Sequence, residues 1–395
     1  MWSGSFLLKI APDQRLFCAQ APHDWMHSPR MSLDSAIPKH LRCPRRTQQA
    51  STPAQDFEPP YPSYSARFPE NVSNMVMAVI GAQYKTAADA DGTAQTKLST
   101  FFTSPNCPGP SFFEWASVTD AKGYYNLTAL SYWPSKGAYE TWTTESGFDA
   151  WWRGLTKPEE ECSDKQHGWF LEVFFPTVER LETLFNTNAT PEGFGHLKEG
   201  MSEAVQEHGY WGSMRDRLPA AQVDALVGDK AATVGEETNP REGSYRVKIE
   251  GKKNLTVIRS GQDWLDTSPE ERKLYLEEMH PVLTKGMDFL RDNGREVGCH
   301  SCRLMDVVDP VTLKADKDRT FGLAYFDDIA SLEKWSKEHP THLAIFGGFH
   351  QYARKLGNNV TLRVFHEVMV LEAGQQVFEY VGCHEGTGML KFHRV

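Results

Sequence analysis

The chain contains no apolar run of the length that a membrane span requires. A spanning helix needs about 18 consecutive, mostly apolar residues, and no stretch of the 395-residue sequence approaches this. Near the N-terminus, Lys9 and Asp13 follow Phe6–Leu8 and leave it too short for the apolar centre of a secretory signal. We therefore expect no membrane partner.

Cysteine is also scarce. The seven cysteines are odd in number and scattered, unlike a disulfide framework, and indicate a reducing, cytoplasmic location. Cys299 and Cys302 lie close together, but covalent haem attachment needs a histidine directly after the second cysteine, where Arg303 stands. Structural zinc would need a second pair of ligands. We expect ordinary strand thiols at both positions.

Basic residues are not in excess, and no nucleotide-binding motif is present. Lys and Arg number 42 against 52 Asp and Glu, and the formal net charge of −10 argues against nucleic acid as a partner. The glycine-rich segment 382–388 lacks the lysine of a phosphate-binding loop and a following helix. It is typical of a turn.

Apolar and aromatic residues are plentiful enough to form a core. Hydrophobic residues make up 40% of the chain, with 11 Trp and 22 Phe, and this length usually divides into two domains that share an interface. Prolines between residues 44 and 70 prevent regular structure there. We expect an extended arm over 31–74, a first domain over 75–245 with insertions, and a second domain over 246–395.

Apolar periodicity predicts the elements of the first domain. Strands are expected at Met75–Tyr84, Phe112–Val118 and Tyr124–Trp133, and a polar, alanine-containing segment at 86–102 suits a helix.

The second domain begins with the same signals. A strand is expected at Leu255–Arg259, and Ser268–Glu271 forms a capping box that opens an amphipathic helix. Pro281 should kink this helix and Gly294 should end it.

Two further strands follow, at 297–308 and 320–326, and Ile329–Trp335 begins the helix that carries His342.

An internal repeat supports this division. The same four residue types recur at offsets of 0, 8, 10 and 13, as Tyr132, Glu140, Trp142 and Glu145 and again as Tyr325, Glu333, Trp335 and Glu338. The repeat predicts an α+β fold made of two βαββαβ units, each an antiparallel sheet with helices on one face. Two such sheets packed face to face would form a barrel-like sandwich with helices outside.

The histidines near the C-terminus are the first candidates for chemistry. His339 and His342 lie on the predicted helix, and His366 lies 24 residues after His342 in a strand-like run. Imidazole ligates iron or zinc and exchanges protons near neutral pH, so one histidine could bind a metal while the other acts as acid or base. Taken alone, the pattern favours packing or surface histidines.

Longer segments carry a resemblance. The segments 207–217, 258–264, 286–294 and 384–390, together with His339–His342 and Phe365–Val368, closely resemble the haem-containing aldoxime dehydratases and run in that family's order. The resemblance covers roughly residues 31–395. It implies ferredoxin-like units of the dimeric α/β-barrel type, a haem b cofactor and a homodimer. Residues 1–30 have no counterpart and are expected to be a flexible extension, or to follow a start codon placed too early.

The resemblance also assigns residues. His342 falls at the proximal haem ligand, with His339 as the next candidate, and His366 falls at the distal histidine. Ser260 and Arg217 match other distal polar residues, and Glu182 matches a carboxylate of the same network. The alternatives are a turn residue for Ser260, a surface charge at a helix end for Arg217 and a solvated helix residue for Glu182. The connection between His342 and His366 is slightly longer than in bacterial relatives, which affects distal geometry more than the ligand.

The expected activity is that of a haem b lyase that converts aldoximes to nitriles. Ferrous iron would bind the oxime nitrogen, Ser260 would hold the hydroxyl group, and His366 would protonate it as it leaves. Arg217 and Glu182 would tune His366. Two alternatives remain open, a peroxidase or chlorite-dismutase-like haem enzyme and a non-catalytic haem carrier or gas sensor.

Overall fold

The computed structural model describes residues 33–51, 57–155, 167–229, 245–309, 311–315 and 317–392. The extension expected over residues 1–30 lies outside these ranges. Residues from Leu33 onward form one compact unit. Within the described ranges, no helix combines the length and the apolar character needed to cross a membrane.

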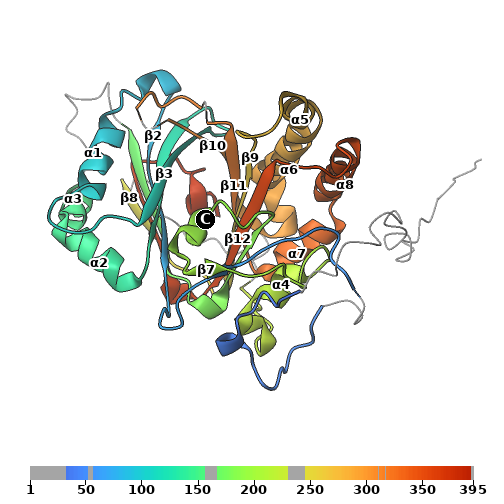
Figure 1. The fold of residues 1–395 in the computed structure, drawn as a ribbon. Coiled ribbons are helices and arrows are strands. Elements are labelled where there is room, and N and C mark those ends of the chain that lie inside the picture. Colours follow the sequence, from blue (N-terminus) through green and yellow to red (C-terminus); the bar gives the residue numbers. More distant parts are fainter. Residues whose placement is uncertain are drawn as a thin grey trace, which may run out of the picture. The chain divides into compact units, whose positions relative to one another are not determined.

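Strands from both halves of the chain form one antiparallel sheet (Figure 1). Its eleven strands are, in spatial order, Leu181–Phe185 (β6), Arg363–Leu371 (β12), Leu255–Asp263 (β9), Arg319–Phe326 (β11), Cys299–Val307 (β10), Phe112–Thr119 (β3), Tyr125–Trp133 (β4), Val76–Tyr84 (β2), Gly168–Phe174 (β5), Gln376–Val381 (β13) and Arg246–Ile249 (β8). A separate two-stranded sheet pairs Ala66–Arg67 (β1) with Gly200–Met201 (β7).

Each half follows the β-α-β-β-α-β order of elements. The first unit runs from β2 to β5, with Thr93–Phe102 (α1) in its first crossover and Lys136–Glu145 (α2) and Phe148–Gly154 (α3) in its second. The second unit runs from β9 to β12. Its helices are Pro269–Leu274 (α5), His280–Asn293 (α6), Ile329–Glu338 (α7) and Pro340–Lys355 (α8). In both units the first strand lies between the third and fourth strands, so the units share one topology.

The expectation of two sheets packed face to face is confirmed only in part: the inner faces of the two units share one core, but their strands belong to a single sheet. Strand β3 pairs with β10 through Ser117 and Ala116, opposite Asp306 and Val307, and this joins the units into one curled sheet. Pairing satisfies backbone groups that would otherwise lie at two exposed edges. Strand β6, from the first predicted domain, pairs at the edge of the second unit. Strands β13 and β8, from the second predicted domain, extend the edge of the first unit. Each predicted domain therefore contributes strands to the sheet of the other.

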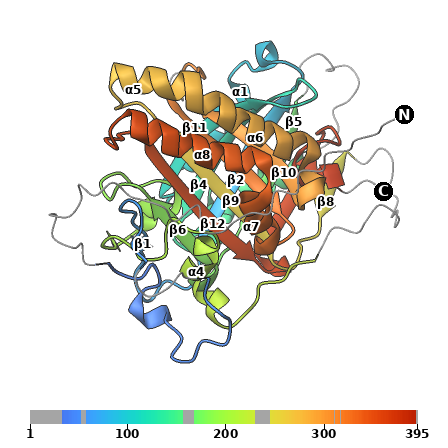
Figure 2. The ribbon, with the colours of Figure 1, turned by 90° about the vertical axis from the view of Figure 1, so that its right-hand side faces the viewer.

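The inner faces of both units share one hydrophobic core. It includes Met77, Leu130 and Phe174 from the first unit and Val257, Phe321 and Met369 from the second. Helices α1 to α3 cover the outer face of the first unit, and α5 to α8 cover that of the second (Figure 1). Figure 2 shows α6 and α8 side by side across the second unit.

The single helix expected to run through His342 is instead two helices. Helix α7 ends at Glu338, His339 has an extended backbone with φ −81° and ψ 132°, and α8 begins at Pro340. Proline cannot donate the hydrogen bond that would continue α7, and it disfavours helical geometry at the residue before it. His339 therefore caps α8 rather than lying inside a helix.

Other helix boundaries also differ from the sequence interpretation. Helix α1 begins at Thr93, seven positions later than expected, after a 3-10 turn at Ala87–Asp89. Near Pro281 the helix contains a π-helical turn at Tyr275–Met279, a local widening that proteins use where the regular hydrogen-bond ladder is interrupted.

The predicted capping box is only half formed. Ser268 accepts a hydrogen bond from the Glu271 amide, as expected. The Glu271 carboxylate does not reach back; it accepts hydrogen bonds from Tyr352 of α8 and from the Thr361 and Leu362 amides. Glu271 therefore fixes the connection between α8 and β12.

Aromatic packing on the first unit predicts a large stability contribution from Trp142. Its side chain is fully buried and its indole N–H donates to the Phe101 carbonyl at 2.9 Å. Trp142→Ala should lower the free energy of unfolding by about 3–5 kcal/mol. Glu140→Ala, on the exposed face of the same helix, should change it by less than about 0.5 kcal/mol. Urea unfolding followed by circular dichroism would measure both, and equal effects would contradict the packing described.

Candidate functional site

Three predicted site residues form a buried hydrogen-bonded network. Glu182 on β6 and Arg217 at the end of Ser213–Arg217 (α4) make a two-point ion pair, with N–O distances of 2.8 and 3.1 Å. The Nε2 atom of His366 on β12 lies 3.0 Å from Glu182 Oε1 and 2.8 Å from Arg217 Nη2. The structural alternatives for two of these residues are therefore wrong, because Glu182 is a strand residue and both charged side chains are only 1% exposed.

Strand pairing explains why these side chains meet. In the antiparallel register, Glu182 lies opposite Val368, two residues from His366. Side chains at alternate positions of a strand share a face, so Glu182 and His366 point to the same side. Arg217 reaches them from α4 and is held further by the Glu207 carbonyl at 2.8 Å.

Ser260 lies on the same face in the neighbouring strand. It is directly opposite His366 in the β9–β12 pair and opposite Gly322 in the β9–β11 pair. Ser260 is thus a central strand residue, and the turn expected as its alternative is wrong. Val364 and Val368 share the His366 face and Phe365 packs on the other, against Phe185, as the alternation predicts.

The network fixes the charge of Glu182. Burial alone would raise the pKa of this carboxyl, but the charges of Arg217 and His366 outweigh burial and lower the pKa to about 2. The His366 Nε2 atom faces both a donor and an acceptor. The imidazole can therefore keep a hydrogen bond with or without a proton at Nε2, which suits a group that exchanges protons.

One buried histidine beside the network was given no role by the sequence. His208 is 5% exposed, and its ring lies 4.5 Å from the Tyr61 ring. Burial, and then the nearby charges of Arg217 and His366, lower the pKa of His208 to about 3. It stays neutral near pH 7. Its place in the 207–217 segment was the only signal, because burial is not visible in the sequence.

His342 lies on α8, in the layer of helices over the outer face of the second unit. Its ring packs 4.7 Å from Trp335 and 6.0 Å from Trp211. Burial lowers the pKa of His342 to about 4, partly offset by the Ser336 carbonyl, and Nδ1 is buried without a hydrogen-bond partner in the described part of the chain. A neutral imidazole can ligate a metal. His339 instead contacts the Thr341 hydroxyl at 2.8 Å and stacks on Phe289.

Close packing places α6 against the sheet beside Ser260, and α8 against α6. A Cβ atom at Gly322, beside Ser260, would lie 2.9 Å from Met287 of α6, and one at Gly286 would lie 2.7 Å from Ile345 of α8. Helices α6 and α8 therefore lie against each other across this part of the second unit (Figure 2).

The two units differ at this outer face. The topological equivalents of Ser260 and His366 are Ile80 and Leu171, which also lie opposite each other and are 0% and 5% exposed. Large aromatic side chains fill the layer above them, including Trp133, Trp142 and Trp152. In α8 only Tyr352 is buried, while the apolar Leu343 is 40% exposed and Phe346 and Phe349 are half-buried. The second unit therefore combines a polar sheet face with a helix whose apolar side is incompletely covered.

Cys299 and Cys302 are buried thiols of β10, as expected. Burial raises the pKa of Cys302 to about 12 and also raises that of Cys299 well above its usual range, so neither thiol is ionised near neutral pH.

Comparison with known proteins agrees with the resemblance found in the sequence. The family model for haem-containing dehydratases matches residues 78–389. The chain is 37% identical to an aliphatic aldoxime dehydratase from Pseudomonas chlororaphis, over 91% of this chain and 98% of that protein. It is 28% identical to phenylacetaldoxime dehydratase from Bacillus sp. (strain OxB-1), over 86% of this chain and 94% of that protein.

Two solved structures are also similar. One is an aldoxime dehydratase, with a TM-score of 0.80 and 37% identity over 91% of this chain and 98% of that one. The other is an aldoxime dehydratase in complex with butyraldoxime, with a TM-score of 0.81 and 35% identity over 92% of this chain and 98% of that one.

The ion pair predicts a pH-dependent stability. Glu182→Gln leaves the buried Arg217 without an anion and should lower the free energy of unfolding by about 3 kcal/mol at pH 6. Because the pKa of Glu182 falls from 4.5 to about 2 on folding, its contribution is full above pH 4.5 and is lost as the pH falls toward 2. Denaturant unfolding at several pH values should show the gap from the unsubstituted protein narrowing over that range. Glu179→Gln, at an exposed position nearby, is the control, and a gap independent of pH would contradict the assignment.

Proposed function

This chain belongs to the haem-containing dehydratase family, and we propose that it dehydrates aldoximes, R-CH=N-OH, to nitriles. The observation that carries this proposal is the buried Glu182–Arg217 pair that holds His366 directly opposite Ser260. A hydroxyl donor beside a proton-exchanging imidazole is the pair of groups that loss of hydroxide from an oxime requires.

We propose haem b with ferrous iron as the cofactor and His342 as its protein ligand. The neutral imidazole, its unpartnered buried Nδ1 atom and the incompletely covered apolar side of α8 fit such a group. When bound, haem would supply a ferrous coordination position for the oxime nitrogen and electron density toward the N–O bond.

The protein residues would handle the protons. Ser260 donates a hydrogen bond that orients the oxime hydroxyl, and protonated His366 gives its proton to that oxygen as the N–O bond breaks and water leaves. The imidazole then takes the proton from the oxime carbon, which completes the nitrile and restores His366. The reaction moves no net protons or electrons. Glu182, with its pKa near 2, stays ionised and stabilises the imidazolium, while Arg217 orients both groups.

The two alternative functions use this network less fully. A peroxidase or chlorite dismutase would need an arginine or aspartate available to the departing group, whereas Arg217 is bound to Glu182, the Glu207 carbonyl and His366. A haem carrier would need only His342 and an apolar pocket. Such a protein would make no use of Ser260 or of the proton exchange that Glu182 and Arg217 would support at His366.

A product assay separates these functions. Haem-loaded protein should convert butyraldoxime or phenylacetaldoxime to one equivalent of nitrile without peroxide. A protein that binds haem but forms no nitrile, or that oxidises a dye only when peroxide is added, would overturn the proposal.

We further propose a homodimer of ferredoxin-like units located in the cytoplasm. Cys43, Cys107, Cys299, Cys302 and Cys383 are all free thiols among the described residues, which suits a reducing compartment.

His342→Ala should yield folded protein that retains no haem, because the variant loses the axial bond that anchors the macrocycle. His339→Ala should retain haem, since that ring caps α8 and stacks on Phe289. The ratio of Soret to protein absorbance after purification measures both. Full haem content in the His342 variant together with loss in the His339 variant would reverse the assignment.

His366→Ala should keep haem and still give the spectral change on adding aldoxime to the reduced protein. Its kcat should fall by at least about 100-fold, the usual effect of losing a general acid. Steady-state nitrile formation and an optical titration measure the two properties separately. A variant that turns over at nearly the unsubstituted rate would show that the proton comes from another group.

A further inference from the structure

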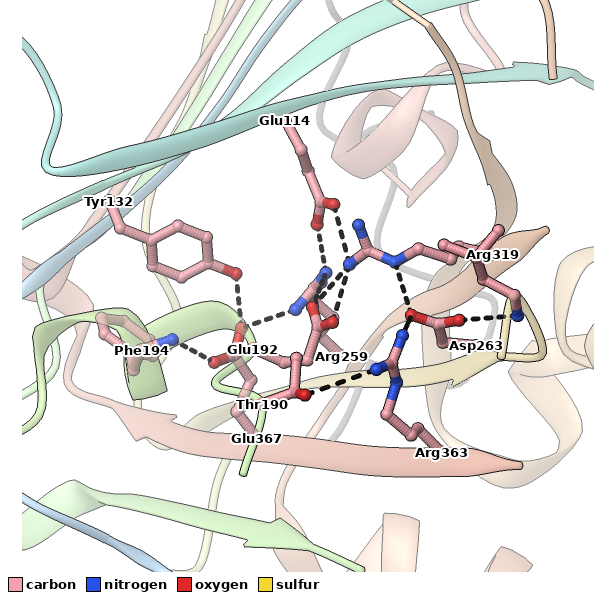
Figure 3. Close-up of polar contacts among 11 residues, drawn as sticks. Glu114, Tyr132, Thr190, Glu192, Phe194, Arg259, Asp263, Arg319, Arg363 and Glu367 are labelled. Carbon is pink, nitrogen blue, oxygen red and sulfur yellow. Dashed lines mark hydrogen bonds and ion pairs between the residues drawn. The ribbon is translucent and has the colours of Figure 1, made fainter. Parts of the chain in front are cut away.

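A second polar cluster lies on the inner face of the sheet, directly behind Ser260 and His366 on the outer face. It contains three arginines and four carboxylates, namely Arg259, Arg319, Arg363, Glu114, Glu192, Asp263 and Glu367 (Figure 3). Arg259 adjoins Ser260 in β9, and Glu367 adjoins His366 in β12. Because successive side chains of a strand point to opposite faces, this cluster backs the residues proposed to handle the substrate.

Arg259 is the centre of the cluster. Its side chain is fully buried, and its guanidinium carbon lies 4.6 Å from the Phe321 ring centroid and 4.8 Å from that of Phe365. The guanidinium also pairs with Glu114 of the first unit. A planar cation held between two rings has little rotational freedom, so Arg259 fixes the position of β9 relative to β11 and β12.

Glu367 links β12 to the first unit. Its carboxylate accepts a hydrogen bond from the Tyr132 hydroxyl at 2.5 Å and another from the Phe194 amide at 2.8 Å. Arg259 Nη1 lies 3.9 Å from the same carboxylate. Side chains from β4 and β9 and a backbone amide from the segment after β6 therefore converge on one residue next to His366.

Strand register makes the two faces dependent on each other. Arg259 lies opposite Glu367, and Ser260 lies opposite His366, as successive pairs of the same β9–β12 ladder. A shift or rotation of β12 that loosened the rear contacts would also move His366 relative to Ser260 on the front face.

The other unit contains an equivalent contact without an equivalent site. Tyr325, the repeat partner of Tyr132, donates to Glu172 of β5 at 2.5 Å, and Glu172 occupies in the first unit the position that Glu367 occupies in the second. Behind Glu172 the outer face carries the apolar Ile80 and Leu171. In both contacts a buried tyrosine hydroxyl donates to a buried glutamate, although Glu172 also accepts from Tyr380 and pairs with Arg303. Only the Tyr132–Glu367 contact backs a polar pair.

We propose that Arg259, Glu367 and Tyr132 are positioning residues that set the separation of Ser260 and His366. The first unit, through Tyr132 and Glu114, thereby determines the geometry of a site that lies in the second unit. The inference rests on the proposed function of Ser260 and His366. All three positioning residues lie on the inner face of the sheet, opposite the face that carries Ser260 and His366.

The test compares Tyr132→Phe with Tyr325→Phe in haem-loaded protein. Each variant removes one hydroxyl and leaves one buried glutamate with one hydrogen bond fewer. The readouts are thermal stability, kcat and KM for butyraldoxime, and the C–O stretching band of the reduced protein's carbon monoxide complex, which reports the polar surroundings of the distal pocket.

Both variants should lose stability, and Tyr325→Phe at least as much as Tyr132→Phe, because the Tyr325 hydroxyl also accepts a hydrogen bond from Arg303. Tyr132→Phe alone should shift or broaden the C–O band and lower kcat by about tenfold, the scale seen when residues that orient active groups are lost, with KM changed less than twofold. Tyr325→Phe should keep the original band and kcat. Glu367→Gln replaces one acceptor oxygen with a donor and should show the same change in the C–O band as Tyr132→Phe. It provides the test if Tyr132→Phe does not fold.

Matching C–O bands and kcat values in Tyr132→Phe, Glu367→Gln and Tyr325→Phe would overturn the proposal. An unsubstituted protein that forms no nitrile would instead refute the proposed function. The two failures are therefore distinguishable.

Discussion

The polar side of the candidate site depends on one buried ion pair. Glu182 and Arg217 are each 1% exposed, and removing either partner would strand a charge in the interior at a cost of about 3–5 kcal/mol. Neither residue belongs to the elements that repeat between the units; β6 and α4 both lie between β5 and β9. The insertion in the first half of the chain therefore supplies the groups that orient His366 in the second half.

The same sheet topology has been put to two uses. In the first unit the outer face is apolar and an aromatic layer fills the space beneath the helices, so that unit has a packing role. In the second unit, Ser260 and His366 replace an apolar pair, and α8 leaves its apolar side partly uncovered. The two units are connected by their shared inner core and by the polar cluster around Arg259.

Much of the local structure could be predicted from the sequence, because strands such as Val76–Tyr84 and Tyr125–Trp133 follow from apolar patterns and the repeat predicted their order. The break at His339 was missed although Pro340 signals it, since apolar periodicity continues on both sides. The pairing of β3 with β10 could not be predicted, because edge pairing leaves no residue signature. Glu182, Arg217 and Ser260 were named only through the family resemblance; their spacing of tens of residues says nothing about contact. Arg259 looked like an ordinary strand residue.

The most direct test of the proposed dehydration is its dependence on the redox state of the iron. Dehydration transfers no net electrons, yet weakening the N–O bond requires an electron-rich metal that binds the oxime nitrogen. Nitrile formation from phenylacetaldoxime should be compared anaerobically in dithionite-reduced and in oxidised haem-loaded protein. We expect rapid nitrile formation in the reduced sample and little in the ferric one, with no oxidant added. Equal or faster nitrile formation by the ferric sample would contradict this expectation.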